Sequence, residues 1–361
     1  MTARTVAVPL PHGAYGVVVG SGLLAQAGDR IRRACPAARY ALIADQTVAD
    51  LYAARLAVQL DATIHTFPAG EAQKTRTTWT QLTDALLASG LGRDGALVAL
   101  GGGVPGDVAG FVAATYLRGI PYVQVPTTLL AMVDSSVGGK TGVDAAQGKN
   151  LIGAFHQPRL VLADVHTIAT LPPAHRRAGL VEALKHGAVA DAGYFDRLVA
   201  ARDALLAADP EALIEAVVRS VAIKAEVVTA DATERGRRAV LNAGHTVGHA
   251  LETASDYTLA HGEAVAIGLV VEARIGEQLG VTARGTAGRL RDAFQRCGLP
   301  VSPPTIDRNR LREALAADKK NRGGEIRLTL LASIGAVHQT NTETWTTPVP
   351  ENMVVEAVQA S

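Results

Sequence analysis

The sequence predicts an α/β domain with a parallel sheet in its first half and a helical domain in its second half. Between residues 14 and 165, short runs rich in β-branched residues alternate with helical patterns, which is typical of βαβ units. After Leu171 these runs give way to long amphipathic patterns that indicate helices. The 361 residues exceed one typical domain. We therefore expect two domains, residues 1–171 and 172–361, with a boundary at Pro172 and Pro173.

Composition narrows the class of protein. The chain is 48% hydrophobic and 19% charged, as in ordinary globular proteins. A net charge of +1 without blocks of like charge disfavours nucleic-acid binding. Cys35 and Cys297 lie too far apart in the sequence for a CxxC motif, which favours a reducing compartment. Without a signal-like N-terminus or an apolar run of roughly 20 residues, we expect a cytoplasmic protein that does not enter a membrane.

Three strands stand out in the first half, at residues 40–44, 96–100 and 122–125. Ligands of parallel sheets bind at the carboxyl ends of the strands. The residues that follow these three strands are Asp45, Gly101 to Gly103, and Thr127 with Thr128. The sequence therefore predicts a binding site along that edge of the sheet.

A glycine-rich loop at 101–107 precedes a helical pattern at 108–115. Glycines there would let backbone N–H groups approach a pyrophosphate at the positive end of the helix. The loop does not match GxGxxG, so a tight turn that packs helix on strand is the alternative. Asp45 could likewise accept hydrogen bonds from a ribose or simply cap a helix.

A dense polar stretch follows. The segment 138–141 resembles part of a phosphate-binding P-loop, but that motif requires glycine where this chain has Asp134. The remaining polar residues, spread among glycines, are Asp134, Ser135, Ser136, Lys140, Lys149 and Asn150. Two lysines beside glycine loops suit an anionic substrate, whereas a solvated loop is the alternative interpretation.

The second half contains helical patterns at 178–189, 210–229, 238–255 and 263–279, with a late strand or hairpin at 326–331. Lys185, Lys224 and Arg238 lie in otherwise apolar patterns, where an uncompensated charge would be costly to bury. Each could instead face solvent. Glu234 precedes Arg238 by four residues and could be its helical salt-bridge partner.

Histidines cluster in the same region. His245 and His249 are four residues apart in a helical pattern and would share a face. Imidazole pairs at this spacing bind zinc when a third ligand is present, and His261 and Glu182 are candidates. The spacing nominates His245, His249 and His261 and leaves open which of them bind.

These segments resemble the 3-dehydroquinate synthases over essentially the whole chain. The most specific matches are PTTLLA (126–131), VDSSVGGKTG (133–142) and GKNLIGAF (148–155). The glycine loop at 101–107, the Glu182/Lys185 pair, residues 242–249, residues 261–263 and the block Asp318-Lys319-Lys320 also match. The resemblance implies an N-terminal Rossmann-like NAD domain, an all-α C-terminal metal-binding domain and a homodimer.

The resemblance also implies roles for individual residues. Glu182, His245 and His261 would hold a divalent ion, usually zinc with cobalt as an alternative, and His249 would face the substrate. Residues implied for substrate and catalysis are Asp134, Lys140, Asn150, Lys185, Lys224, Glu234, Arg238, Asn242, His249 and, from a partner subunit, Arg118. Residues implied for NAD are Asp45, Glu71, Lys74, Gly103, Val104, Gly106, Asp107, Thr127, Thr128, Lys140 and Lys149. One of Lys319 and Lys320 would also enter the site.

The implied substrate is a phosphorylated seven-carbon sugar acid, 3-deoxy-D-arabino-heptulosonate 7-phosphate. The implied reaction combines transient NAD-dependent oxidation, phosphate elimination, reduction and intramolecular aldol closure, as in the shikimate pathway of aromatic amino-acid biosynthesis. Another sugar-phosphate cyclase is the alternative: Asn242, His249 and the block 318–320 favour the dehydroquinate type over the valiolone type, but an amino-dehydroquinate synthase would look nearly the same. A polyol dehydrogenase of related fold would not need so many cations, and a silent NAD or metal sensor would not need the catalytic set. Pro105, Ala243 and residues 144–147 depart from the family pattern.

Overall fold

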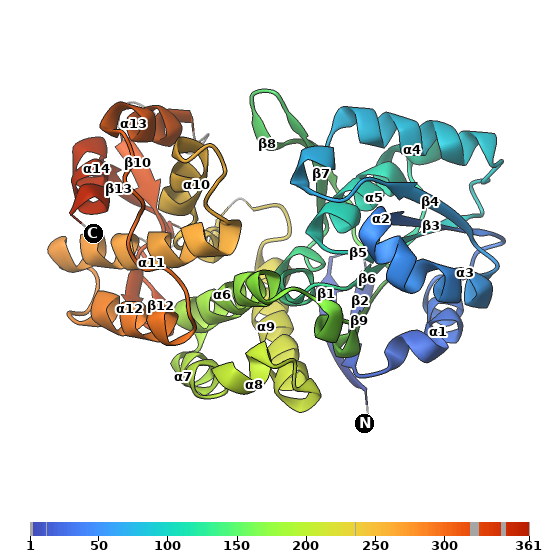
Figure 1. Ribbon diagram of the computed structural model, residues 1–361, viewed down its shortest axis with the longest axis horizontal. Helices are drawn as coiled ribbons and strands as arrows, with labels where there is room; N and C mark the ends of the chain where they lie inside the picture. Colours follow the sequence, from blue (N-terminus) through green and yellow to red (C-terminus); the bar gives the residue numbers. More distant parts are fainter. Residues whose placement is uncertain (1–2, 12, 235, 318–324, 341–343, 361) are drawn as a thin grey trace. The chain divides into compact units, whose positions relative to one another are not determined.

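The computed structural model describes residues 3–11, 13–234, 236–317, 325–340 and 344–360. Its internal contacts divide the chain into two compact units. Unit 1 comprises Met1–Pro172 and Ala208–Thr229, and unit 2 comprises Pro173–Ala207 and Ala230–Ser361. The long helix α9 (Pro210–Ala230), which the sequence analysis groups with the second domain, therefore lies in unit 1 up to Thr229. Figure 1 labels the elements of both units.

Unit 1 is built on a seven-stranded sheet in the order β1-β2-β9-β6-β5-β3-β4. Only the β1–β2 pair in this sheet is antiparallel, and the other neighbours run parallel. The strands are β1 (Arg4–Leu10), β2 (Gly13–Gly20), β3 (Tyr40–Asp45), β4 (Thr63–Phe67), β5 (Ala96–Gly101), β6 (Tyr122–Pro126) and β9 (Leu160–Asp164). The three strands predicted from the sequence, β3, β5 and β6, are confirmed as neighbours in this sheet.

Helices cover both faces of the sheet because consecutive strand residues point to opposite sides. Leu42 packs in one core with α1 (Ala27–Ala34) and α3 (Ala54–Leu60). Its neighbour Ile43 packs in the other core with α4 (Arg76–Ala88) and α5 (Gly103–Thr115). Shorter helical segments are η1 (Leu23–Gln26), α2 (Gln46–Val48), η2 (Ala49–Ala53), η3 (Glu71–Gln73), η4 (Tyr116–Arg118), η5 (Ala131–Ser135) and η6 (Val165–Thr170). The predicted α/β class is confirmed.

A β-hairpin occupies most of the polar stretch for which a solvated loop was the alternative interpretation. Its strands are β7 (Lys140–Ala145) and β8 (Gly148–Phe155), which pair antiparallel with Lys140 opposite Phe155. These strands are difficult to predict from the sequence, because they consist largely of small and polar residues and lack the alternation of β-branched and polar residues typical of strands. A single parallel bridge joins Thr75 to Asp144. The hairpin is thus attached to the segment that precedes α4.

Unit 2 is mainly helical, as predicted, with two small two-stranded sheets added. The helices described in unit 2 are α6 (Pro173–Ala190), α7 (Ala192–Ala200), α8 (Arg202–Leu206), η7 (Arg237–Asn242), α10 (His245–Ala254), α11 (His261–Gln278), α12 (Thr286–Arg296), α13 (Arg308–Ala317) and α14 (Glu351–Gln359). The sheets pair β10 (Glu325–Leu328) with β13 (Thr347–Pro350), and β11 (Leu331–Ser333) with β12 (Ala336–Val337). β10 and β11 account for the late strand signal at 326–331. Within the described ranges, no helix is both long and apolar enough to cross a lipid bilayer.

The predicted helix at 238–255 is wrong as a single element. The structure has η7, then Gly244 in a left-handed conformation (φ 78°), then α10. A Cβ atom at Gly244 would lie 2.5 Å from Leu269 Cγ, so a larger residue would meet both strain and a steric clash there. The helical periodicity of the sequence continues through this break and conceals it.

Candidate active site

Three residues of unit 2 converge on one point. Glu182 lies inside α6, His245 is the first residue of α10, and His261 is the first residue of α11. The Oε1 atom of Glu182 lies 3.6 Å from His245 Nε2 and 3.5 Å from His261 Nε2. One ligand atom from each residue falls within 4.8 Å of the others. The structure thus brings together the three residues that the family resemblance implies as metal ligands.

Lys185 forms an ion pair with the other carboxylate oxygen of Glu182. It follows Glu182 by three residues on α6, and its Nζ atom lies 2.5 Å from Oε2. Both side chains are at most 2% exposed, so this pair offsets the cost of burying two charges. With Oε2 paired, Oε1 faces the two histidines.

Glu252 also belongs to the site, although it is not among the residues predicted from the sequence. It is buried on α10, and its Oε1 atom lies 3.4 Å from His261 Nδ1. His261 therefore faces Glu252 with one ring nitrogen and Glu182 with the other, an arrangement that in metal sites fixes the orientation of a histidine ligand. Three helical positions separate Glu252 from His249. This spacing places Glu252 on the same helix face as His249 and could have indicated it from the sequence. A glutamate in an amphipathic pattern, however, usually faces solvent.

The expectation from spacing alone paired His249 with His245 as ligands. Their rings are neighbours, with centroids 5.3 Å apart. However, His249 Nε2 lies 4.0 Å from Glu252 Oε2, and His249 groups with Glu252 and His261 rather than with Glu182. The side chain of His249 is 52% exposed. This placement fits a residue beside the cluster better than a ligand within it.

Electrostatics of the cluster favour a cation. Burial, followed by the positive charge of Lys185, lowers the pKa of His245 well below its usual value, so this imidazole is neutral. Burial also disfavours charge on His261, but its interactions with Glu182 and Glu252 outweigh burial and raise its pKa to about 10. The two carboxylates thus hold a positive charge on His261, at a position where a metal ion would replace the proton. One carboxylate oxygen and two imidazole nitrogens form a donor set typical of zinc or cobalt.

Arg238, Glu234 and Asn242 lie in or near η7, and hydrogen bonds fix their positions. Arg238 is 2% exposed and donates from Nη1 to the carbonyl oxygen of Ala232, at 3.0 Å. Its backbone N–H donates to Asp231 Oδ2 at 3.0 Å. The expectation that Glu234 and Arg238 lie on one helix is wrong, because Glu234 precedes η7 and has a φ of 59°. Glu234 accepts a hydrogen bond from Asn242 Nδ2 at 3.2 Å.

In unit 1, the strand order reverses between β3 and β5. From β3 the chain continues to the edge strand β4 on one side, whereas β5 leads to β6 on the other. Crevices at such a reversal bind ligands at the carboxyl ends of the strands. Asp45 ends β3 and Gly101 ends β5, so both predicted cofactor segments border this point.

The glycine loop is shorter than predicted, because α5 begins at Gly103 and not at residue 108. Gly103, Val104, Gly106 and Asp107 therefore lie in the first turns of the helix, and the positive end of a helix suits an anion. Gly101 has a φ of 149°, and a Cβ atom there would lie 2.6 Å from Pro105 Cγ. Pro105 itself lies in the first turn of α5, where proline is tolerated.

The neighbouring predicted residues have structural partners. Asp45 Oδ1 caps α2 by accepting from the N–H of Val48 at 3.0 Å, so the capping interpretation is observed. The N–H of Thr127 donates to Gly101 O at 2.9 Å. The Thr128 hydroxyl accepts from the N–H of Ala131 at 3.2 Å. These bonds position the start of the segment that follows β6 against the end of β5.

A second ion pair of predicted site residues, Lys74 with Asp107, lies in unit 1. Lys74 Nζ lies 2.5 Å from Asp107 Oδ2, and Lys74 is 5% exposed. Burial opposes its charge, but Asp107, Glu71 and Asp144 outweigh burial and raise the pKa of Lys74. Lys74 therefore remains a cation beside the N-terminus of α5. This brings together two of the residues predicted to bind NAD.

A third ion pair joins residues predicted to bind substrate. Lys224 on α9 lies with its Nζ atom 2.5 Å from Asp134 Oδ1. On the hairpin, Asp144 Oδ1 accepts from the N–H of Asn150 at 2.7 Å. Asn150 has a φ of 54°, which is uncommon outside glycine. Lys140 and Lys149 lie on the same two strands, β7 and β8.

Arg118 and the pair Lys319 and Lys320 are the remaining residues predicted for the substrate. Arg118 is exposed at the end of η4, where it and Leu117 both adopt positive φ values, 70° and 50°. Consecutive left-handed residues of this kind are costly and occur at functional sites. Lys319 and Lys320 lie outside the described residues.

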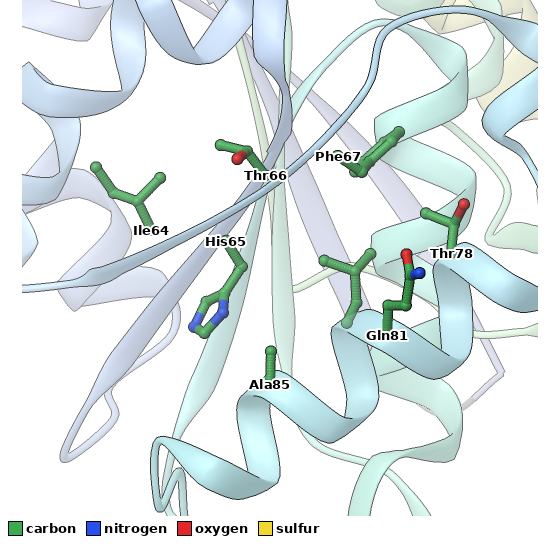
Figure 2. A pocket seen from close by; sticks show the side chains of 8 residues that line it. Ile64, His65, Thr66, Phe67, Thr78, Gln81 and Ala85 are labelled. Atoms are coloured by element: carbon green, nitrogen blue, oxygen red, sulfur yellow. The ribbon is translucent and has the colours of Figure 1, made fainter.

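A pocket of unit 1 is lined by side chains of β4 and α4 (Figure 2). It has a volume of about 270 Å³ between β4 and α4. Its lining residues are Ile64, His65, Thr66, Phe67, Thr78, Gln81, Leu82 and Ala85. None of the site residues predicted from the sequence is among its lining residues.

Comparison with known proteins identifies relatives over nearly the whole chain. Residues 64–178 match the family model described as 3-dehydroquinate synthase N-terminal, and residues 179–321 match the model described as 3-dehydroquinate synthase C-terminal. The chain is 51% identical over 337 residues to the 3-dehydroquinate synthase of Halorhodospira halophila, covering 92% of this chain and 94% of that protein.

Solved structures of sugar cyclases have the same fold. A 2-deoxy-scyllo-inosose synthase in complex with carbaglucose-6-phosphate, NAD+ and Co2+ is 26% identical, with a TM-score of 0.90 over 99% of this chain and all of that chain. The 2-epi-5-epi-valiolone synthase of Streptomyces hygroscopicus, with NAD+ and Zn2+ bound, is 32% identical, with a TM-score of 0.85 over 98% of each chain.

Proposed function

Because the chain belongs to the 3-dehydroquinate synthase family, we propose that it converts 3-deoxy-D-arabino-heptulosonate 7-phosphate into 3-dehydroquinate and phosphate. It is an enzyme of this type, a phosphate-eliminating cyclase. The identity of 51% to a relative of that name extends over almost the full length of both chains. It exceeds the 26% and 32% identities to the other cyclases, which favours this substrate over theirs.

The observation that carries the proposal is the convergence of Glu182, His245 and His261. These three residues would hold Zn2+, with Co2+ as an alternative, since the related cyclases bind these ions together with NAD+. When bound, the ion supplies Lewis-acid polarisation of a substrate hydroxyl, and NAD supplies reversible hydride storage. Lys185 orients Glu182 through their ion pair, and Glu252 holds His261 with Nε2 toward the ion.

Unit 2 also supplies polar groups for the substrate. Lys185 and Arg238 are buried cations, suited to the carboxylate and phosphate of a sugar acid. Glu234 orients the amide of Asn242, which leaves the amide oxygen of Asn242 available to a substrate hydroxyl. The exposed imidazole of His249 would hold or move a proton at the substrate, and Glu252 lies 4.0 Å from its Nε2 atom.

Unit 1 supplies the NAD site and further substrate contacts. We assign NAD to the reversal point between β3 and β5, with the pyrophosphate at the N-terminus of α5 and Lys74 beside it. Residues assigned to NAD are Asp45, Glu71, Lys74, Gly103, Val104, Gly106, Asp107, Thr127, Thr128, Lys140 and Lys149. Residues assigned to the substrate are Asp134, Lys140, Asn150 and Lys224. All of them except the glycines and Val104 carry a polar or charged side chain.

The assembly and compartment are further parts of the proposal. A homodimer would let the exposed Arg118 contact the substrate phosphate bound by a second copy of the chain. The left-handed conformations of Arg118 and the preceding Leu117 support a role other than packing. The two free cysteines, Cys35 and Cys297, are buried and suit the reducing cytoplasm.

Phosphate release from the purified chain tests the function. With NAD, Zn2+ and 3-deoxy-D-arabino-heptulosonate 7-phosphate, we expect steady release of phosphate and formation of 3-dehydroquinate in equal amounts. The corresponding 2-ketose phosphate and the amino analogue serve as comparison substrates. Faster turnover of either comparison substrate would replace the proposed substrate with that one.

A further inference from the structure

Another buried glutamate, Glu272, lies on α11. Glu272 is 2% exposed. Its Oε2 atom accepts a hydrogen bond from the N–H of Gly244 at 2.7 Å, and its Oε1 atom accepts one from the N–H of Val247 at 3.2 Å. A single carboxylate on α11 thus binds two backbone donors that flank His245.

These donors belong to the start of α10. The first N–H groups of a helix have no partner within the helix, and the side chain of the preceding residue usually satisfies one of them. Here the preceding residue is Gly244, which has no side chain. Glu272 therefore provides the cap from a different helix, and its negative charge interacts favourably with the positive end of α10.

Close backbone packing reinforces this attachment. Gly268 precedes Glu272 by one helical turn, and a Cβ atom at Gly268 would lie only 2.0 Å from Gly244 O. The chain before His245 is thus held against α11 at two successive turns. Since α11 begins with His261, the same helix presents one histidine and fixes the start of the helix that presents the other.

We propose that Glu272 is a positioning residue of the metal centre, which it serves by fixing the first turn of α10 and therefore His245 relative to His261. This inference rests on the proposed assignment of Glu182, His245 and His261 as ligands. Without the carboxylate, the first turn of α10 loses its cap, and His245 must be ordered when the ion binds. The ion would then bind more weakly and in an altered geometry.

The chain contains a matched control on the same helix. Glu277 of α11 accepts, through Oε1, a hydrogen bond from the N–H of Ala287 at 2.8 Å. This bond caps α12, which also follows a left-handed glycine, Gly285 (φ 87°). Glu277 thus repeats the capping arrangement of Glu272 at a helix that carries none of the proposed ligands.

The experiment compares Glu272→Gln with Glu277→Gln in the full chain, using Co2+ alone as the probe. Glutamine keeps the size of the side chain but removes its charge and one acceptor oxygen. We expect Glu272→Gln to weaken Co2+ binding about tenfold, as partners of metal ligands commonly do, and to change the visible absorption of the bound ion. Glu277→Gln should lower the melting temperature while it leaves both metal readouts as in the parent.

The outcomes separate this inference from the proposed function. If the parent and the Glu277→Gln variant bind Co2+ and His245→Ala abolishes binding, the metal centre stands. Equal affinity and equal spectra for Glu272→Gln and the parent then overturn the role of Glu272 alone. If the parent binds no Co2+, both assignments are wrong. Should Glu272→Gln fail to fold, Glu272→Asp, which keeps the charge but shortens its reach, decides by the same two readouts.

Discussion

Lys224 donates hydrogen bonds to two oxygens of Asp134, the backbone carbonyl at 2.6 Å and the carboxylate Oδ1 at 2.5 Å, although the two residues are 90 positions apart in the sequence. Lys224 is 6% exposed, so its ammonium group is held in one orientation by a charged partner. Helix α9 thereby places a fixed cation beside the segment that joins β6 to the hairpin. A phosphate or carboxylate that approaches this segment would meet an ammonium group already in place.

We predict that Lys224→Met reduces kcat/KM with the phosphorylated sugar acid by roughly ten- to a hundredfold. This corresponds to the loss of one charge-assisted hydrogen bond of about 1.5–3 kcal/mol. Steady-state kinetics with phosphate detection measure it. Arg219→Met on the same helix is the control, because the Arg219–Glu226 pair is partly exposed at 3.8 Å and such pairs contribute little. Equal effects of the two substitutions would contradict a substrate role for Lys224.

The metal assignment predicts opposite behaviour for two histidines of one cluster. His261→Ala should lose the bound ion and all activity, because it removes one of three ligands. His249→Ala should keep the ion and lose rate, since its ring lies beside the ligand set. Elemental analysis of both purified variants, together with chelation of the parent chain, measures this. An ion lost from His249→Ala and kept by His261→Ala would reverse the assignment.

NAD should act in catalytic amounts. A hydride that is taken from the substrate and later returned leaves no net reduction. We expect product formation to exceed the NAD supplied many times over, while absorbance at the NADH wavelength stays constant at steady state. An NADH signal that grows in step with product would indicate a dehydrogenase instead.

Asp144 should position the hairpin. Its carboxylate holds the N–H of Asn150, which is in a left-handed conformation, and its own N–H donates to Lys74 O at 2.8 Å. Asp144→Ala removes a charge-assisted bond of about 1.5–3 kcal/mol, so KM for the sugar acid should rise at least tenfold. Asp144→Asn keeps an acceptor oxygen and should retain most of the parent affinity. A rise of the same size in both variants would show that the acceptor is not what matters.

Much of the fold follows from sequence patterns, and the exceptions have physical reasons. The buried strands β3, β5 and β6 are predictable because parallel strands buried on both faces have continuous apolar runs. The helices α6, α9 and α11 are long enough for periodicity to reveal them. The break at Gly244 escapes prediction, since it depends on contact with Leu269 of α11, a residue distant in sequence. The hairpin escapes because its strands have too few β-branched residues.

The candidate site is predictable to a similar extent. Spacing nominates the histidines, but the choice between His249 and Glu182 as a ligand depends on α6, which is separated from α10 by more than fifty residues. Only the family resemblance could make that choice from sequence. Glu252 and Glu272 were missed because a buried carboxylate and a solvated one look identical in an amphipathic pattern. Their role becomes visible only when α10 and α11 pack together.

The placement of α9 has a consequence for synthesis of the chain. The chain leaves unit 1 after Pro172, enters unit 2 for residues 173–207, and returns to unit 1 for Ala208–Thr229. Domains generally fold as units while the chain emerges from the ribosome. Unit 1 cannot be completed until α9 has emerged, by which time α6, α7 and α8 of unit 2 are already outside. Folding of the two units on the ribosome must therefore overlap in time, and a chain released at residue 172 would have an incomplete first unit.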